Sequence, residues 1–197
     1  MILPGSMLGM LGGGQLGRMF TLRARAMGYR VTVLDPDADS PAGAVADRHL
    51  RAPYDDPVAL ADLAHHCAAV TTEWENVPAR VLERLGHSIV VRPPIEAVAV
   101  AQDRILEKEF LRGNGFSTAP FHPIRSAGDI PQAFASLDSP CLLKTSRMGY
   151  DGKGQATVAS VDAAIDAFER FGAVPCVLES RLALEREISV VLARASD

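Results

Sequence analysis

The first part of the chain alternates between short apolar runs and longer amphipathic stretches. Met7–Leu11 is apolar, Gly12–Gly17 is rich in glycine, and Leu16–Met27 has apolar residues at helical spacing before Gly28. A second apolar run, Tyr29–Leu34, follows directly. This order predicts a strand, a tight turn, a helix that ends at a glycine, and a second strand parallel to the first.

The same rhythm continues as far as a pair of prolines. Further helices are expected at Pro57–His66 and Pro78–Leu85, and further strands at Ala68–Thr72 and Ser88–Val91. Arg92-Pro93-Pro94 interrupts the pattern and indicates a boundary. Residues 1–94 are therefore predicted to form a Rossmann-like α/β domain with a parallel sheet, and residues 95–197 a second domain.

The second half of the chain has a different order of predicted elements. Helical segments are expected from Ile95 to Arg112, and Asn114-Gly115 ends them. Shorter elements follow, with strands expected at Phe121–Ile124, Cys141–Thr145, Gln155–Val158, Cys176–Glu179 and Glu187–Arg194, and helices at Ile130–Leu137 and Val161–Phe171. Strands and helices mixed in this way predict a small α+β unit.

Composition narrows the classes of function. The chain has 197 residues, 48% of them hydrophobic, and a formal net charge of -4. An acidic chain does not fit a protein that coats nucleic acid or an anionic membrane, and no run approaches the roughly 20 apolar residues of a membrane span. The N-terminus lacks the features of a signal peptide, and Cys67, Cys141 and Cys176 lack metal-ligand spacing. We expect a cytoplasmic protein with reduced thiols and a small anionic ligand.

The predicted turn after the first strand carries a nucleotide-binding spacing. Gly12, Gly14 and Gly17 satisfy G-x-G-x-x-G, and Asp35 follows the second strand about 20 residues later. The helix N-terminus behind such a turn attracts a phosphate or a carboxylate, and Asp35 could accept hydrogen bonds from a ribose. The glycines also fit a tight strand-to-helix turn without a ligand, although we favour ligand binding. An NAD-binding Rossmann oxidoreductase is one open interpretation, although nothing after Pro94 offers a recognisable acid/base group for hydride transfer.

A second feature favours a nucleoside triphosphate. Lys144 lies in an apolar predicted strand, and the glycine-rich segment Gly149–Gln155 with Lys153 follows it. Glycines let backbone N–H groups approach a phosphate, while the two lysines supply positive charge. The spacing differs from a Walker P-loop because no Ser or Thr follows the Gly-Lys pair. A glycine-rich hairpin with a solvated lysine is the structural alternative.

Several short motifs occur together along the chain. They are Gly12–Met19 (GGGQLGRM), Thr72–Pro78 (TEWENVP), Gln102-Asp103-Arg104, Lys144, Gly149–Gln155, Glu179 and Glu185–Val190 (EREISV). In order and spacing, these motifs resemble the ATP-grasp family, and within it the carboxylating ligases of purine biosynthesis, over essentially the whole chain. The resemblance implies a PreATP-grasp domain followed by an ATP-grasp domain that is incomplete here, with a lid subdomain at about 118–180.

The resemblance also implies roles for individual residues. The residues expected to bind ATP are Arg104, Lys144, Gly149, Tyr150, Asp151, Gly152, Lys153, Gly154, Gln155, Glu179, Ser180, Arg181, Leu182 and Glu187. The residues expected to contact the substrate are Gln15, Leu16, Glu75, Tyr150 and Asp151. Glu73 and Glu75 flank Trp74, and strand alternation would place both carboxylates on one side; the resemblance favours Glu75. The segment 146–154 is expected to be mobile until phosphates order it.

The implied reaction is the ATP-dependent carboxylation of 5-aminoimidazole ribonucleotide with bicarbonate, through carboxyphosphate, in de novo purine biosynthesis. The resemblance further implies Mg²⁺ and a homodimer. In the family the Mg²⁺ ligands come from a later part of the chain, so none is assigned here. We expect the sequence to be either a fragment or a truncated form that should not turn over, in which case it is a non-catalytic nucleotide-binding unit whose strand Ile188–Leu192 leaves an exposed sheet edge.

Overall fold

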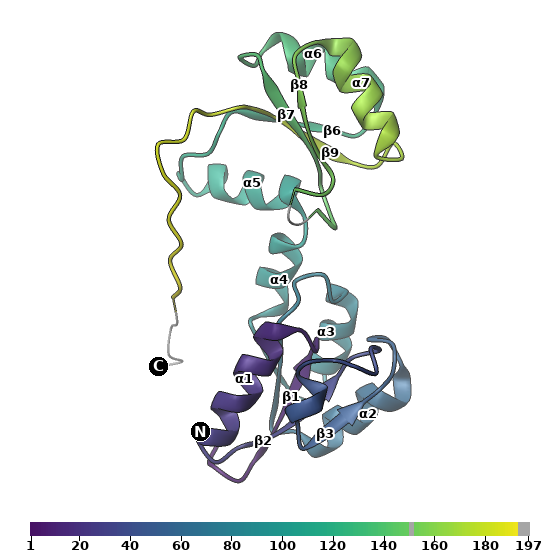
Figure 1. Ribbon diagram of the computed structural model, residues 1–197, viewed down its shortest axis with the longest axis vertical. Helices are drawn as coiled ribbons and strands as arrows, with labels where there is room; N and C mark the ends of the chain where they lie inside the picture. The colour runs from purple at the N-terminus through teal and green to yellow at the C-terminus, as the bar shows by residue number, and fades with distance from the viewer. Residues whose placement is uncertain (150–151, 193–197) are drawn as a thin grey trace. The chain divides into compact units, whose positions relative to one another are not determined.

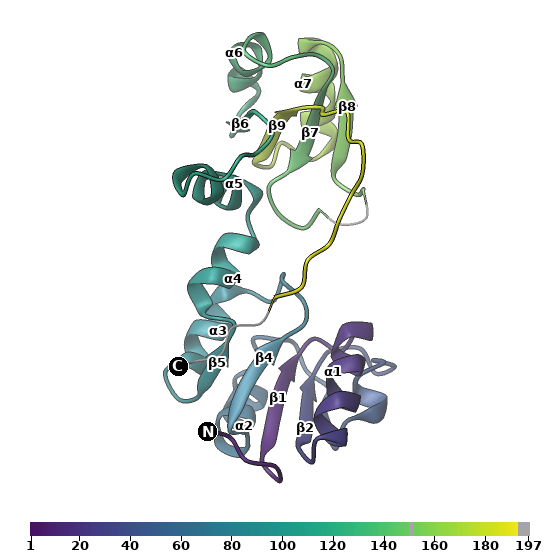
Figure 2. The ribbon, with the colours of Figure 1, turned by 90° about the vertical axis from the view of Figure 1, so that its left-hand side faces the viewer.

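A computed structural model describes residues 1–149 and 152–192 (Figures 1 and 2). Contacts between Cα atoms divide the chain into two compact units, Met1–Glu107 and Lys108–Asp197. Each unit has its own sheet and its own buried apolar cluster. The mixed α/β class predicted from the sequence is confirmed.

The first unit is built on a five-stranded parallel sheet with the order β3-β2-β1-β4-β5. Its elements are β1 (Met7–Leu11), α1 (Gln15–Ala26), β2 (Arg30–Leu34), a 3-10 turn (Gly43–Val45), β3 (Arg48–Leu50), α2 (Pro57–His66), β4 (Ala69–Thr72), α3 (Ala79–Gly86), β5 (Val90–Arg92) and α4 (Ile95–Ala101). The predicted strands and helices of this unit are present within about two residues of their expected ends. The short edge strand β3 has no counterpart among the predicted strands.

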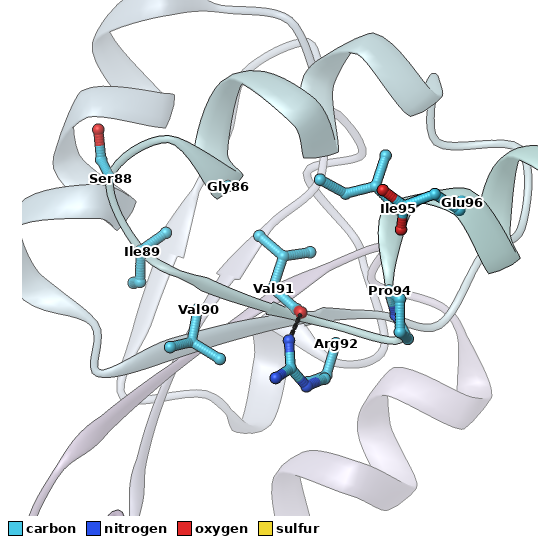
Figure 3. Close-up of a pocket in the computed structure, with 9 residues that line it drawn as sticks. All are labelled: Gly86, Ser88, Ile89, Val90, Val91, Arg92, Pro94, Ile95 and Glu96. Atoms are coloured by element: carbon cyan, nitrogen blue, oxygen red, sulfur yellow. Dashed lines mark hydrogen bonds between the residues drawn. The ribbon is translucent and has the colours of Figure 1, made fainter.

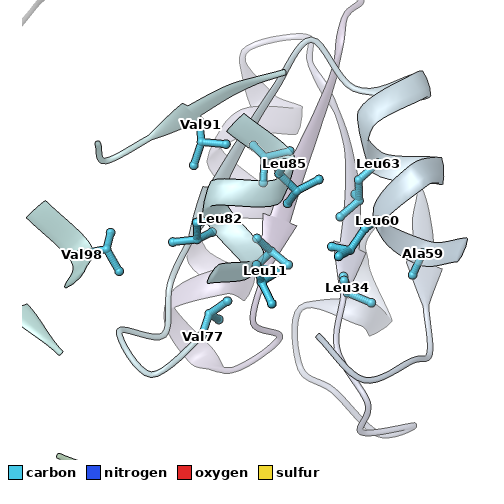
Figure 4. Packing of buried hydrophobic residues seen from close by; sticks show 12 residues of the cluster. Leu11, Leu34, Ala59, Leu60, Leu63, Val77, Leu82, Leu85, Val91 and Val98 are labelled. Atoms are coloured by element: carbon cyan, nitrogen blue, oxygen red, sulfur yellow. The ribbon is translucent and has the colours of Figure 1, made fainter. Parts of the chain in front are cut away.

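Helices cover both faces of this sheet. On one face, Met10 and Val33 pack with Ala24 of α1. On the other, Leu11 packs in a cluster with Leu63 of α2 and with residues of α3, as Figure 4 shows. Because successive side chains of a strand point to opposite faces, β1 supplies both clusters from adjacent residues. The carboxyl ends of β1 and β4 then lie side by side, which is where ligands bind in open parallel sheets.

The first unit extends past the predicted boundary at Pro94. Val98 of α4 is buried in the same cluster as α3, and the side-chain amide of Gln102 donates to the carbonyl oxygen of Val77. The helical segments expected over Ile95–Arg112 are present as two helices, which are separated at Gln102-Asp103. The carboxylate of Asp103 accepts hydrogen bonds from the N–H groups of Ile105 and Leu106 and so caps α5 (Arg104–Gly113), within which the two units divide.

The second unit is a four-stranded antiparallel sheet with the order β6-β9-β7-β8. Its elements after α5 are β6 (Phe121–Ile124), a 3-10 turn (Ala127–Asp129), α6 (Ile130–Ala135), β7 (Cys141–Thr145), β8 (Gln155–Val158), α7 (Val161–Arg170) and β9 (Cys176–Ser180). Cys176 and Leu178 of β9 pack with α6 and α7 on one face. By alternation, Val177 and Glu179 face the other side.

The strand predicted at Glu187–Arg194 is not formed within the described residues. Residues 181–192 have no regular secondary structure, and Ile188, Val191 and Leu192 are 82%, 93% and 87% exposed. A strand is stable only where a neighbour accepts its backbone hydrogen bonds and covers one face, and this segment has no such neighbour among the described residues. The apolar sequence of this segment predicts a strand, but it does not specify a neighbouring strand with which to pair. The last two positions of the predicted strand, 193 and 194, lie outside the described residues.

Candidate nucleotide and substrate site

The glycine turn of the first unit is occupied by a carboxylate of the chain itself. One oxygen of Glu73 accepts a hydrogen bond from the N–H of Gly14 (2.7 Å), and the other accepts one from the N–H of Gly17 (3.2 Å). Glu73 follows β4, the strand beside β1, so its carboxylate reaches the N-terminus of α1. A negative charge is favourable there because the first N–H groups of a helix have no partner within the helix.

A further N–H of the turn, that of Gly13, is bound by the carboxylate of Asp35. This carboxylate accepts hydrogen bonds from the N–H of Gly13 (2.7 Å), the N–H of Asp37 (2.8 Å) and the hydroxyl of Tyr54 (2.8 Å). Burial, followed by the hydrogen bond to Asp35, raises the pKa of Tyr54. Asp35 is only 8% exposed, so its carboxylate has a structural role in this conformation.

These contacts argue against a dinucleotide at the turn. A pyrophosphate would need the same N–H groups that Glu73 and Asp35 occupy, and a ribose would need the oxygens that Asp35 already uses. The turn does present side chains outward, because Gln15 and Leu16 are exposed at the start of α1. The sequence spacing predicts a bound anion at this turn, and in the structure the chain's own carboxylates bind the N–H groups of Gly13, Gly14 and Gly17.

Glu73 and Glu75 differ in a way that alternation does not predict. Residues 73–78 form turns and not a strand, so the two side chains need not share a face. Glu73 is partly buried against the glycine turn, while Glu75 is exposed and accepts a hydrogen bond from the side chain of Asn76 (3.1 Å). Glu75 is accessible to a ligand, whereas Glu73 shapes the turn beneath it.

The second unit contains a buried cluster of three charged side chains. Glu179 of β9 pairs through one oxygen with Lys144 of β7 and through the other with Lys108 of α5, at 2.7 Å. Only 6% of the Glu179 side chain is exposed, against 16% for Lys108 and 24% for Lys144. Two cations around one carboxylate leave a net positive charge beside the glycine-rich segment that follows β7.

The two lysines also set the protonation of Glu179. Burial alone would raise the pKa of this carboxyl group, but hydrogen bonds and charge from Lys108 and Lys144 outweigh burial and lower it below its usual value of 4.5. Glu179 is therefore ionised throughout the neutral range. Protonating it would leave two partly buried ammonium groups without their counter-charge.

The lowered pKa makes stability depend on pH in a defined direction. Because the folded pKa lies below the unfolded one, Glu179 contributes full stability above about pH 4.5, and this contribution is lost as the pH falls through the folded pKa. We expect the urea midpoint of the second unit, followed by circular dichroism, to fall more between pH 6 and pH 3.5 in the wild type than in Glu179→Gln. Equal falls in the two proteins would contradict this assignment.

The glycine-rich segment is anchored at both ends to the β7–β8 pair. The N–H of Thr145 donates to the carbonyl of Gly154 (2.8 Å), and Lys144 lies opposite Gln155. Gly154 has a φ of +67°, and a side chain there would meet Thr145, so this position requires glycine. Gly149, Gly152 and Lys153 lie on the connection between the strands, with Lys153 exposed; Tyr150 and Asp151 lie outside the described residues.

The segment expected to line an adenine leaves β9. The N–H groups of Ser180 and Arg181 donate to the carbonyls of Pro120 (3.0 Å) and Pro140 (3.2 Å). A base bound here would have to use other backbone groups, such as the carbonyls of the segment or the N–H of Leu182. Glu187 is exposed beyond this segment, and Arg104 is partly buried at the start of α5.

Of the residues that the structure brings into these sites, sequence reasoning does not name Lys108, and it names Glu73 but favours Glu75. The family motifs favour Glu75. Glu73 lies two residues closer to the end of β4, and this position could have indicated that its carboxylate reaches the glycine turn. Lys108 lies one helical turn after Arg104, the predicted cation, and this i, i+4 spacing could have suggested it.

In the described part of the chain, a pocket, the cysteines and the remaining acidic side chains offer no further candidate site. A shallow pocket of about 450 Å³ beside β5 is lined mainly by apolar residues and contains none of the predicted site residues, and the Arg92 guanidinium at its edge donates to the carbonyl of Val91 (Figure 3). Burial raises the pKa of Cys67 and Cys176 to about 11, so both are protonated thiols at neutral pH. Across residues 1–149 and 152–192, no three His, Cys, Asp or Glu side chains gather as a metal site, and no helix could span a bilayer.

Comparison with known families accounts for both units. The model of the ribonucleotide synthetase preATP-grasp domain matches residues 6–102, and the model of the ATP-grasp domain matches residues 109–197. The two matches follow one another and correspond closely to the two compact units. The chain belongs to the ATP-grasp family, with a PreATP-grasp domain followed by part of an ATP-grasp domain.

Within that family, its relatives are N5-carboxyaminoimidazole ribonucleotide synthases. The enzyme of that name from Brucella melitensis is 43% identical over 97% of this chain and 53% of its own length. A crystal structure of N5-carboxyaminoimidazole synthetase from Staphylococcus aureus complexed with ADP has a TM-score of 0.87 and 37% identity, over 92% of this chain and 48% of that one. The enzyme from Aspergillus clavatus, in complex with ADP and 5-aminoimidazole ribonucleotide, has a TM-score of 0.80 and 28% identity, over 91% and 47%. The chain thus spans about half the length of these relatives.

Proposed function

We propose that this chain forms the nucleotide- and substrate-binding part of an enzyme that carboxylates 5-aminoimidazole ribonucleotide with bicarbonate and ATP. The product is N5-carboxyaminoimidazole ribonucleotide, formed through carboxyphosphate in purine biosynthesis. The observation that carries the proposal is the net positive cluster of Lys108, Lys144 and Glu179 at the base of a glycine-rich connection. The neighbours solved with ADP, and in one case also with the ribonucleotide, support it.

In this proposal, ATP binds to the second unit. Lys144 and Lys153, with Arg104, offset the charge of the triphosphate, and the glycines between 149 and 155 bring backbone N–H groups to the phosphates. Backbone groups of residues 179–182 contact the adenine, and Glu187 accepts hydrogen bonds from the ribose hydroxyls. Residues 118–180 act as the lid, which excludes water from the labile carboxyphosphate.

The ribonucleotide is assigned to the exposed part of the first unit. Gln15 and Leu16 at the start of α1 and Glu75 after β4 lie near the carboxyl ends of two adjacent strands. Glu73 keeps the turn beneath them in one conformation. Binding there would mostly position the exocyclic amine, which is the main requirement when a carboxyl group passes from carboxyphosphate to an amine and phosphate leaves.

Magnesium would neutralise phosphate charge in such a reaction. Among residues 1–149 and 152–192, no three His, Cys, Asp or Glu side chains gather that could hold it, so no ligand is named and no step is assigned to the metal here. A homodimeric assembly and a cytoplasmic location complete the proposal.

The proposal predicts a clear choice of nucleotide. We expect ADP and ATP to bind the chain in calorimetric titrations and 5-aminoimidazole ribonucleotide to bind with ADP present. NADH should show no fluorescence enhancement, because Glu73 and Asp35 occupy the N–H groups that its pyrophosphate needs.

Asp35→Ala provides the control for this choice. An NADH signal in the micromolar range that disappears in Asp35→Ala would replace the proposal with an oxidoreductase. Absence of ADP binding in a folded chain would also contradict it.

A further inference from the structure

Contacts with a carboxylate and an aromatic ring place Lys108 in the charged cluster of the second unit. It projects from α5 and pairs with one oxygen of Glu179, while Lys144 pairs with the other. Its ammonium also lies 5.2 Å from the centre of the Phe121 ring, and Phe121 is the residue of β6 directly opposite Glu179. A cation is favourable over an aromatic face, so the ring and the carboxylate together hold Lys108 in place.

The position of Lys108 changes what Lys144 can offer to a ligand. A buried carboxylate with one lysine forms a neutral pair, which attracts an anion weakly. With two lysines the same carboxylate is shared, and the cluster retains one positive charge in a partly buried site, where charge interactions are stronger than in water. The Lys144 side chain is the more exposed of the two, so the excess charge is presented on its side.

We propose that Lys108 is a positioning residue for the nucleotide: by sharing the carboxylate of Glu179, it keeps the charge of Lys144 available to phosphate groups. This inference rests on the proposed ATP site. It differs from a purely structural ion pair in one measurable respect, because a structural pair would affect all ligands of the site alike, whereas an electrostatic role grows with the number of phosphates.

The chain offers a matched control for this idea. Arg112 lies one turn further along α5, and its guanidinium also sits over the Phe121 ring, 4.6 Å from the centre. The ion pairs of Glu179, however, are those with Lys108 and Lys144. Replacing Arg112 therefore removes a cation from the same helix and ring without changing the cluster.

Nucleotide titrations of Lys108→Met, Lys108→Arg and Arg112→Met test the inference. Adenosine, AMP, ADP and ATP are titrated into each folded variant by calorimetry. We expect Lys108→Met to lower the affinity for ATP about 10-fold, to lower the affinity for ADP less, and to leave the affinity for adenosine unchanged. The affinity for ATP should recover in Lys108→Arg and should not change in Arg112→Met. An equal loss for adenosine and ATP, or unchanged ATP affinity, would overturn it.

A measurement without nucleotide separates this inference from the proposed function. The chain has only three lysines, Lys108, Lys144 and Lys153, so acetic anhydride labelling followed by peptide mass spectrometry can follow Lys144 directly. In Lys108→Met, Glu179 pairs with Lys144 alone, and we expect labelling of Lys144 to slow several-fold relative to Lys153. An unchanged ratio would overturn the sharing of Glu179, whereas a wild-type chain that fails to bind ATP would overturn the proposed function.

Discussion

Replacing Gly13 by alanine is expected to destabilise the first unit by about 3 kcal/mol, the upper part of the range for overpacking a filled site. A Cβ at this position would collide with the hydroxyl of Ser40 and lie 2.9 Å from the Cβ of Asp35. Ser40 is 1% exposed and donates to the carbonyl of Gly13 (2.9 Å), and Asp35 accepts from its N–H, so neither neighbour can move without losing a hydrogen bond.

Trp74 makes this loss measurable. It is the single tryptophan of the chain and packs against Tyr54 in the first unit, with ring centres 5.7 Å apart, so its fluorescence reports the unfolding of that unit in urea. Gly5→Ala is the control, because Gly5 has a φ of +93° and no atom near its missing Cβ. It should cost about 1 kcal/mol through its backbone alone. Equal losses in the two variants would mean that the space around Gly13 is not restrictive.

Lys144→Ala is expected to lower the affinity for ADP and ATP about 100-fold while leaving the second unit folded. The loss follows from removing a cationic donor from the proposed phosphate site. The fold should survive because Glu179 keeps its ion pair with Lys108 when Lys144 is removed. A carboxylate stripped of both partners would be far more costly.

Calorimetric titration measures the affinity of this variant, and circular dichroism checks its fold. Arg170→Ala is a suitable control, since Arg170 is an exposed cation at the end of α7, the helix that packs on the opposite face of the sheet from Glu179. It should bind nucleotide like the wild type. Unchanged ADP affinity in Lys144→Ala would contradict the central assignment of the second unit.

The regular elements could be predicted because their hydrophobic periods are local properties. β1, α1 and β2 follow from an apolar run, a helical spacing and a second apolar run, each within a dozen residues. β3 escapes prediction because Arg48-His49-Leu50 has one apolar residue and no alternation to detect. The strand expected at Glu187–Arg194 is a wrong prediction for the opposite reason. Its apolar pattern is clear, but a strand also needs a neighbour to pair with, and no local pattern specifies that neighbour.

The site could be predicted less completely, since its contacts join distant parts of the chain. Glu73 and Gly14 are 59 residues apart, and Asp35 and Gly13 are 22 apart. Spacing indicates an anion at the turn but gives no means to tell a ligand from a side chain. Lys144 and Glu179 are predicted individually from the family motifs, while their contact with each other and with Lys108 depends on how β7, β9 and α5 pack.

The carboxylate of Glu73 accepts hydrogen bonds from N–H groups of the glycine turn that a cofactor phosphate would otherwise bind. A search for dinucleotide fingerprints would select this chain on Gly12, Gly14, Gly17 and Asp35, and each of those residues is correctly placed. Two carboxylates close the turn: Glu73, directly after the strand that neighbours β1, binds the N–H groups of Gly14 and Gly17, and Asp35 binds that of Gly13. An attempt to install a dinucleotide site on this scaffold would therefore begin at position 73, with the glycines left as they are.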